Sequence, residues 1–177
     1  MSRTREAALA GARRVITELG FRKASMVDIA VRSGMAKATL YNHFRTKEDV
    51  AHALVAQEVG LVLDDALTVK ADPAKALARA AWRVSTHPAL RGALSAEPAL
   101  MGVITASLST HPDVWDHIHQ SVATLLEQTG LDHDEAATDL VLRWLCSCAL
   151  LPLRDGQNPE VFLDQARRLA VTVAPST

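Results

Sequence analysis

Several side chains that donate hydrogen bonds are concentrated in one short stretch of the N-terminal third of the chain. They are Lys37, Thr39, Tyr41, Asn42 and His43. Leu40 and Phe44 lie four residues apart in the same stretch, so on a helix both would point to one side and leave the donors elsewhere. Base edges and phosphate oxygens of DNA accept hydrogen bonds, so such a helix suits the major groove.

Capping signals place this stretch in a pair of short helices. Ser25 is expected to cap the first helix, and Asp28 stands at the position that completes a capping box. Gly34 can adopt the left-handed conformation that ends that helix, and a second helix is expected over residues 36–44. Thr46 is expected to cap the next helix. Two helices joined by a Gly-containing turn, with a donor-rich second helix, are typical of a helix-turn-helix.

The expected contacts with phosphate come from residues that carry short or rigid donors, or that stand where a helix begins. Thr39, Tyr41 and His43 suit phosphate oxygens, which orient a protein without reading sequence. Ser25 and Lys47 each lie at the start of an expected helix, where the positive helix end favours an anion. Packing of Tyr41 against the preceding helix is the alternative for that residue.

The expected contacts with bases come from three other residues. Lys37 can reach the O6 or N7 atom of guanine, Asn42 can pair with adenine, and Ala38 can meet the methyl group of thymine. For Asn42, a contact with DNA and a packing role are both left open.

The whole stretch resembles the DNA-binding signature of tetracycline-repressor-type (TetR family) transcriptional regulators. The matching residues occur in order and without gaps: Ser25, Ile29, Ala30, Gly34, Thr39, Leu40, Tyr41, His43, Phe44, Lys47 and Glu48. The resemblance implies a regulator that binds double-stranded DNA and aims Lys37, Ala38 and Tyr41 at bases. One position departs from the family pattern, because Ala36 stands where Ser or Thr usually caps the second helix. Loss of such a cap typically costs about 0.5–2 kcal/mol.

The distribution of charge agrees with a DNA-binding end. The 177 residues carry a net charge of −1, which by itself indicates no nucleic-acid partner. Residues 1–50, however, hold ten Lys and Arg against five Asp and Glu, whereas residues 51–177 hold nine against fifteen. A basic head on an acidic body suits a protein that places one end on phosphate. Chance clustering of charge is the alternative.

Hydrophobic periodicity predicts an all-α protein, since no stretch alternates as a strand does. The first helix is expected over residues 3–19, and a long helix over residues 46–67 has no linker that separates head from body. We therefore expect an N-terminal three-helix DNA-binding domain over residues 1–48. Residues 49–177 are expected to form a helical domain for ligand binding and dimerisation.

Two helices near the C-terminus are apolar over much of their surface, which predicts either an oligomer interface or a central place in the core. The residues expected at a dimer contact are Val141, Leu145, Cys148, Phe162 and Leu169. The resemblance implies a homodimer formed through the last two long helices. Two recognition helices would then lie roughly 34–36 Å apart, or a small multiple of that, on a palindromic operator. Burial of both helices within one chain is the alternative.

The resemblance also implies a pocket for a small inducer whose binding shifts the long helix, spreads the heads and releases DNA. The protein would then be a ligand-responsive repressor. Large or aromatic side chains are the candidates for the pocket wall: Trp82, Met101, Trp115 and Trp144. Walls of this kind suit an apolar or amphipathic ligand. Ordinary core filling is the alternative for each of them, and Trp144 can equally serve a dimer contact.

No motif for catalysis, for a cofactor or for a metal is recognised. The sequence contains no Gly-rich phosphate loop, no Gly-x-Ser-x-Gly and no His-Glu-x-x-His. Asp113 and His117 stand four apart, but two ligands alone make a weak metal site. A regulator rather than an enzyme is therefore expected. A helical carrier of lipids or other small molecules, or an enzyme with an unrecognised site, is the rival class.

The cysteines and the longest apolar run indicate where the protein is found. Cys146 and Cys148 would point to different sides of a helix, which makes a mutual disulfide poor, and two free thiols fit a reducing cytoplasm. The run over residues 140–153 is interrupted and shorter than the roughly 20 residues that span a bilayer. We expect a cytoplasmic protein with no membrane partner.

Overall fold

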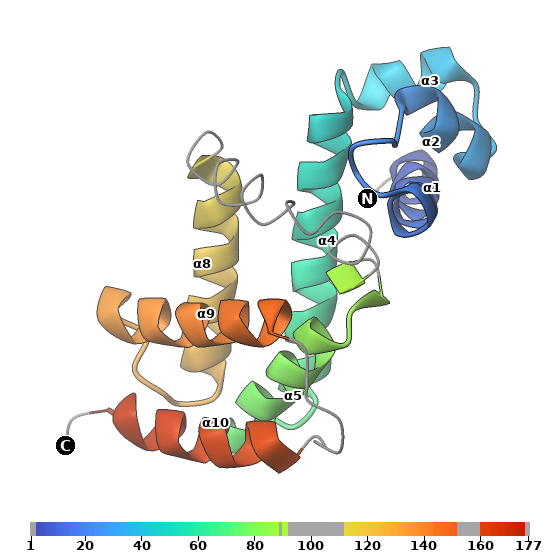
Figure 1. Ribbon diagram of the computed structural model, residues 1–177. Coiled ribbons are helices and arrows are strands. Elements are labelled where there is room, and N and C mark those ends of the chain that lie inside the picture. The colour runs from blue at the N-terminus through green and yellow to red at the C-terminus, as the bar shows by residue number, and fades with distance from the viewer. Residues whose placement is uncertain (1–2, 89, 92–111, 152–159, 176–177) are drawn as a thin grey trace. The chain divides into compact units, whose positions relative to one another are not determined.

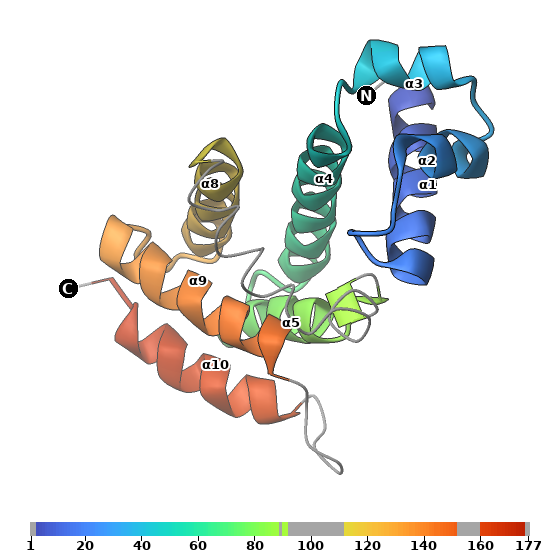
Figure 2. The same cartoon turned by 45° about the horizontal axis from the view of Figure 1, so that its top comes forward.

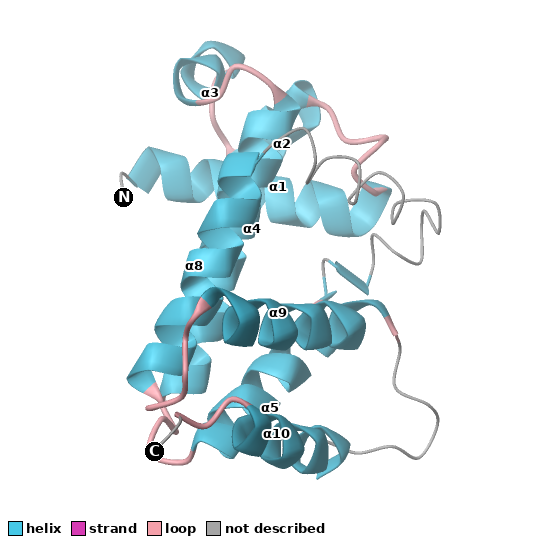
Figure 3. Cartoon of the chain, turned by 90° about the vertical axis from the view of Figure 1, so that its left-hand side faces the viewer, coloured by secondary structure: helices cyan, strands magenta, loops and turns pink. Residues whose placement is uncertain are grey.

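The computed structural model describes residues 3–88, 90–91, 112–151 and 160–175, and these residues form helices joined by turns, with no strand among them (Figures 1 and 3). The helices are α1 (Arg3–Leu19), α2 (Met26–Ser33), α3 (Lys37–His43), α4 (Lys47–Leu67), α5 (Pro73–Ser85), α8 (Pro112–Gln128), α9 (Glu135–Leu150) and α10 (Glu160–Thr172). The all-α prediction is confirmed. None of the helices in the described part of the chain is long and apolar enough to cross a membrane.

The internal contacts divide the chain into two compact units. The first comprises residues 1–57 and 88–114, and the second comprises residues 58–87 and 115–177. The division falls within α4, between Gln57 and Glu58, so this helix contributes residues to both units. The expected domain boundary after residue 48 stays a prediction.

The second unit is built around α5, which packs against α9 and α10 (Figure 2). Asp72 caps α5 by accepting a hydrogen bond from the amide of Lys75, and Pro73 follows at the first helical position. Asp134 caps α9 through the amide of Ala137. Asp132 accepts from the amide of Asp134 at 3.1 Å.

An ion pair fastens the end of α4 to α5 within this unit. The Nε and Nη2 atoms of Arg79 each lie 2.9 Å from a carboxylate oxygen of Asp65. This hydrogen bonding from Arg79 lowers the pKa of Asp65 below its usual value, against a smaller opposing effect of burial. Both side chains reach solvent, so the contribution of the pair to stability is modest.

The first unit contains the head, which we define as α1, α2, α3 and the first turns of α4. Its core is made of apolar side chains, among them Leu9, Ile29, Leu40, Phe44 and Val50, all of which are buried. Leu9 comes from α1, Ile29 from α2, Leu40 from α3 and Val50 from α4. Every helix of the head therefore contributes at least one side chain to this core.

The tightest helix contact in the head is between α1 and α2, and it depends on Gly11. A Cβ atom at position 11 would lie 2.8 Å from both the Cβ and the N atom of Ser33, and 3.0 Å from the carbonyl oxygen of Ile29. Two of these three neighbours are backbone atoms, which cannot swing away. Arg32 and Glu18 add an exposed ion pair between the same two helices, with Nη2 and Oε2 2.6 Å apart.

We expect Gly11→Ala to lower the free energy of unfolding by roughly 1–3 kcal/mol, because the added methyl group forces α1 and α2 apart. Gly60→Ala is the matched control, since Gly60 lies inside α4 with no atom within 4 Å of its added Cβ. Helix propensity alone should make that change stabilising by about 0.5–1 kcal/mol. Urea unfolding followed by circular dichroism measures both. Equal stability of Gly11→Ala and the wild type would contradict the close contact.

Candidate nucleic-acid interface

The solvent-facing side of α3 carries the residues that the sequence predicted for DNA. Lys37, Ala38, Tyr41, Asn42 and His43 are exposed, and Thr39 is half-buried. Leu40 is the buried residue of this helix. The structure thus brings six of the predicted contact residues together on one short helix with a single inward anchor.

Tyr41 lies at the surface rather than in the contact between α2 and α3. It is 43% exposed, which argues against the packing alternative. The Nζ atom of Lys37 lies 5.7 Å from the centroid of the Tyr41 ring, within the range of a cation–π interaction. The pair is on successive turns of the helix, so the ring helps to hold the ammonium group over the exposed face.

The turn between α2 and α3 has the geometry that the sequence predicted. Gly34 has a φ of +67° and ends α2, and the amide of Met35 donates to the carbonyl of Ala30 at 3.0 Å. At the other end of α2, the hydroxyl of Ser25 donates to Asp28 at 2.5 Å and accepts from the Asp28 amide at 3.2 Å. The capping box is confirmed. The Ser25 hydroxyl is engaged in that cap, and the expected contact of this helix start with phosphate stays a prediction.

The recognition helix α3 begins without a side-chain cap. Ala36 occupies the N-cap position with φ −65° and ψ 143°, and no side chain bonds to the free amides of the first turn. At the other end, the amide of Phe44 donates to the carbonyl of Leu40 at 2.9 Å. The order of α3 therefore depends on its C-terminal half and on the burial of Leu40.

Lys47 makes contacts that the sequence did not predict. Its Nζ atom lies 3.1 Å from the carbonyl oxygen of Phe21, 3.2 Å from that of Arg22 and 3.2 Å from that of Ala24. An ammonium group has three hydrogens to donate. All of them are directed at the turn between α1 and α2 in the DNA-free head, and the expected contact of this ammonium with phosphate stays a prediction.

The start of α4 is held by a second set of bonds. The carboxylate of Asp49 accepts from the amides of Arg45 and Thr46 at 3.1 and 3.0 Å, and the Asp49 amide donates to the Thr46 hydroxyl at 3.0 Å. The predicted capping box at Thr46 is confirmed. The hydrogen bond from the Thr46 amide is the main reason that the pKa of Asp49 is lowered.

One contact of the head gave no signal in the sequence. The guanidinium carbon of Arg5 lies 4.6 Å from the centroid of the Phe44 ring, which joins α1 to the residue just after α3. Arg5 and Phe44 are far apart in the sequence, and no local pattern links them.

Residues 8–54 match the model of a protein family described as bacterial regulatory proteins, tetR family. The match covers most of α1, all of α2 and α3, and the first turns of α4. Over these residues the chain carries the DNA-binding domain of TetR-family transcriptional regulators. No curated protein matches the sequence.

Solved structures of the same fold cover nearly the whole regulator. A TetR transcriptional regulator from Rhodococcus sp. RHA1 has a TM-score of 0.65 and 20% identity, over 97% of this chain and 96% of that one. The TetR family repressor AlkX from Dietzia sp., implicated in biodegradation of n-alkanes, has a TM-score of 0.66 and 17% identity, over 96% of this chain and 94% of that one. The fatty acid degradation regulator FadR from Bacillus halodurans has a TM-score of 0.62 and 17% identity, over 96% of this chain and 95% of that one. These similarities establish the fold.

The second unit of the regulator contains the tryptophans predicted for an effector pocket. Trp82, Trp115 and Trp144 are half-buried and pack against the same apolar core. Trp82 meets the ring of Phe162 edge-on, with centroids 6.5 Å apart. Trp144 donates from Nε1 to Gln165 at 2.9 Å. Met101 lies outside the described residues.

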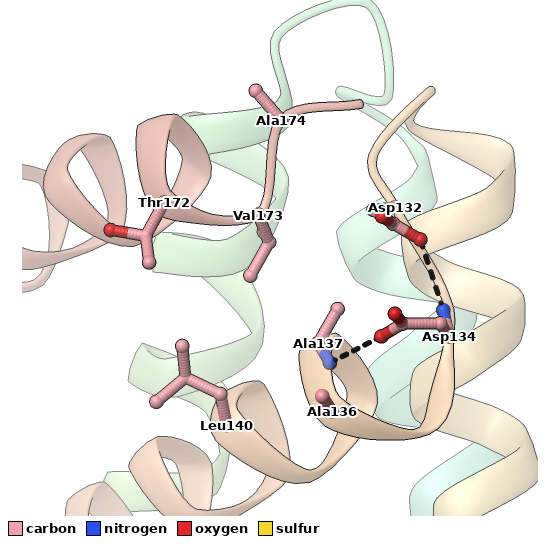
Figure 4. A pocket seen from close by; sticks show the side chains of 8 residues that line it. All are labelled: Asp132, Asp134, Ala136, Ala137, Leu140, Thr172, Val173 and Ala174. Carbon is pink, nitrogen blue, oxygen red and sulfur yellow. Dashed lines mark hydrogen bonds between the residues drawn. The ribbon is translucent and has the colours of Figure 1, made fainter. Parts of the chain in front are cut away.

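A hollow of about 250 Å³ lies elsewhere in this unit, at the turn that precedes α9 (Figure 4). Its wall includes Asp132, Asp134 and Leu140 together with residues 172–174, and none of the three tryptophans. The amide of Asp132 donates to the carbonyl of Val173 at 2.9 Å, which ties the turn to the end of α10. The hollow therefore gives no support to the predicted pocket.

The residues predicted for dimerisation lie mainly inside one chain. Val141, Leu145, Cys148 and Phe162 are buried in the core of the second unit, and Leu169 is partly buried against it. A second copy cannot contact side chains that their own chain covers. The structure thus supports the core alternative for these residues, and an interface on the same helices must use outward residues.

Neither of the two thiols is an activated nucleophile. Burial raises the pKa of the Cys148 thiol to about 11 and also raises that of Cys146, which keeps both protonated and poorly nucleophilic. His119 lies 3.7 Å from Asp139, and within the described part of the chain no group of three metal-binding side chains is brought together.

We expect Ala36→Ser to stabilise the head by about 0.5–2 kcal/mol, because a serine hydroxyl can accept from an amide of the first turn of α3. The measurement is thermal unfolding combined with hydrogen exchange of the amides of residues 38–40, which should slow. Ala38→Ser is the control, since a serine inside the helix provides no cap and has a lower helix propensity. Equal effects of the two changes would show that the missing cap has no consequence.

Proposed function

We propose that this regulator is a ligand-responsive repressor that binds a palindromic operator as a homodimer and leaves it when a small, largely apolar effector binds. The exposed donor face of α3 carries this proposal. Lys37, Tyr41, Asn42 and His43 are all exposed there, whereas Leu40 alone anchors the helix. A surface helix that keeps its polar donors unburied is suited to reach base edges and phosphates.

The roles of the individual residues follow from their chemistry and position. Lys37 is proposed to read guanine, with its ammonium oriented by the Tyr41 ring. Ala38 is proposed to meet a thymine methyl group, and Asn42 to pair with adenine. Thr39 and His43 are proposed to contact phosphate oxygens.

A homodimer is supported by apolar residues that the last two helices leave exposed. Leu140 on α9 is 41% exposed and Val171 on α10 is 78% exposed, and both flank the buried residues of the same helices. A twofold interface presents each patch twice, so a small apolar face on one chain becomes a larger one in the dimer. We propose Leu140 and Val171 as contacts with the second copy.

The proposed release mechanism requires a mechanical connection between the effector site and the head. Helix α4 runs from Lys47 to Leu67 without a break, and its end is bonded to α5 through Asp65 and Arg79. An effector that displaces α5 or its neighbours would therefore displace α4. Such a ligand can shift the equilibrium between the DNA-binding and released conformations only by binding the released conformation more tightly.

The apolar nature of the effector is supported by the three tryptophans packed on one core. Of two proteins with the same fold, AlkX is a repressor implicated in biodegradation of n-alkanes, and FadR is a regulator of fatty acid degradation; both classes of compound have apolar chains. We place the protein in the cytoplasm, where bacterial DNA lies and where two free thiols stay reduced.

A helical carrier and an enzyme are the rival functions. The salt dependence of DNA binding distinguishes them from the proposed regulator. A protein that neutralises several phosphates loses affinity steeply as salt rises, whereas a carrier has no such dependence. Selection of bound sequences from random duplex DNA provides the operator. We expect two half-sites whose centres lie about 34–36 Å, or a small multiple, apart. Compounds that reverse the binding would then identify the effector.

We expect Lys37→Ala to weaken operator binding by about 1–3 kcal/mol and to relax specificity at one base pair. Tyr41→Phe separates two roles of the tyrosine, because it keeps the ring under the ammonium and removes the hydroxyl. Lys70→Ala is the charge-matched control, since Lys70 is exposed in the second unit. Fluorescence anisotropy on the selected duplex measures these three variants and Tyr41→Ala. Unchanged affinity of Lys37→Ala and Tyr41→Ala would contradict the assignment of this face.

We expect Leu140→Asp combined with Val171→Asp to convert the dimer to a monomer, because each carboxylate would be buried against an apolar partner surface. Val31→Asp is the control, since Val31 is 71% exposed but lies on α2 in the head. Sedimentation equilibrium reports the mass of each variant. A double variant that stays dimeric at the wild-type concentration would place the interface elsewhere.

A further inference from the structure

The side chain of Lys47 connects the start of α4 with the turn that precedes α2. Its Nζ atom lies within 3.1–3.2 Å of the carbonyl oxygens of Phe21, Arg22 and Ala24. The same atom lies 4.7 Å from the centroid of the Phe21 ring. Three carbonyls and one ring thus converge on a single ammonium group, which leaves it no hydrogen for another acceptor.

The turn that receives these bonds sets where α2 begins. Ala24 is buried and immediately precedes Ser25, the N-cap of α2. The Ala24 amide also donates to the carbonyl of Gly20 at 3.2 Å, so the turn closes on itself. Fixing the carbonyls of residues 21–24 therefore fixes the position of the Ser25 cap and of the first turn of α2.

The other end of the connection is equally well fixed. Lys47 is the first residue of α4, between Thr46, which caps the helix, and Asp49, which bonds back to that cap. The backbone of Lys47 cannot move without the first turn of α4. The ammonium group consequently transmits the position of that turn to residues 21–24 rather than following them passively.

We propose that Lys47 is a positioning residue for DNA binding, which couples the start of α4 to the turn before α2 and so sets the placement of the helix-turn-helix. Displacement of the first turn of α4 then moves the turn and α2 together. The coupling through Lys47 adds a step to the proposed release mechanism. Only its role in regulation rests on that proposed mechanism. The coupling itself is a property of the DNA-free head.

The contrary possibility is that Lys47 releases the turn and contacts phosphate when DNA binds. The two possibilities differ in the salt dependence of binding. A lysine that neutralises one phosphate contributes about 0.9 to the slope of log affinity against log salt, whereas a positioning residue contributes nothing. They differ also in the effect of arginine, whose planar fork binds phosphate well but cannot direct three hydrogens from one nitrogen.

The experiment compares Lys47→Met and Lys47→Arg with the wild type on the duplex selected from random DNA, over a range of salt concentrations. Lys70→Met is the control for the loss of one positive charge from an exposed site. We expect both Lys47 variants to bind more weakly with the slope unchanged, and the amides of residues 21–25 to exchange faster. A slope that falls by about 0.9 in Lys47→Met, or full affinity in Lys47→Arg, would overturn the proposal.

A measurement on the wild type keeps the proposal testable if the variants unfold. The three-fold bonded ammonium group should give a slowly exchanging 15N signal in the free protein, and that signal should persist when the duplex is added. A signal that exchanges rapidly in the free protein, or that couples to a phosphorus of the DNA, would contradict the positioning role. Failure of the wild type to bind any duplex would instead reject the proposed function and leave the free-protein result standing.

Discussion

The recognition helix has no stability of its own, and the rest of the head is arranged around that constraint. Helix α3 is seven residues long, far below the length at which an isolated helix is stable in water, and its N-terminus lacks a side-chain cap. Burial of Leu40, together with Phe44 just beyond the helix, must therefore hold it. Such burial is effective only if the surrounding helices are rigid, because a loose core gives little preference for one placement of α3.

That rigidity comes from contacts that fix backbone against backbone. Gly11 lets α1 approach Ser33 and the carbonyl of Ile29, and the α2 turn closes through Gly34. Lys47 bonds the first turn of α4 to the backbone of the turn before α2, and Asp49 bonds it to the backbone of Thr46. Each contact joins elements whose relative position decides where Leu40 is buried. The donors on the outer face of α3 are thus positioned by residues that carry no base contact themselves.

The sequence predicted those features whose causes are local. Capping boxes at Ser25 and Thr46, the left-handed Gly34 and the bounds of α1 depend on residues within a few positions of each other, so pattern alone sufficed. Two features of the fold have tertiary causes that the sequence does not show. Lys47 at a helix start looks free for phosphate until the fold places three carbonyls beside it. Val141 lies on a helix that is apolar nearly all round, and periodicity cannot show which side its own chain covers.

The residues that hold α3 in place are distinct from those on its exposed face, so the exposed residues can vary without loss of the fold. Lys37, Ala38, Asn42 and His43 are exposed and contribute nothing to the apolar core, whereas Leu40 is fully buried. If Lys37, Ala38 and Asn42 contact bases as proposed, substitution at these positions should alter which bases are read without a large change in stability. Substitution at Leu40 would remove the buried residue of α3 itself and should weaken binding to every sequence. A short helix with a single buried residue is, for this reason, a suitable element on which to change specificity.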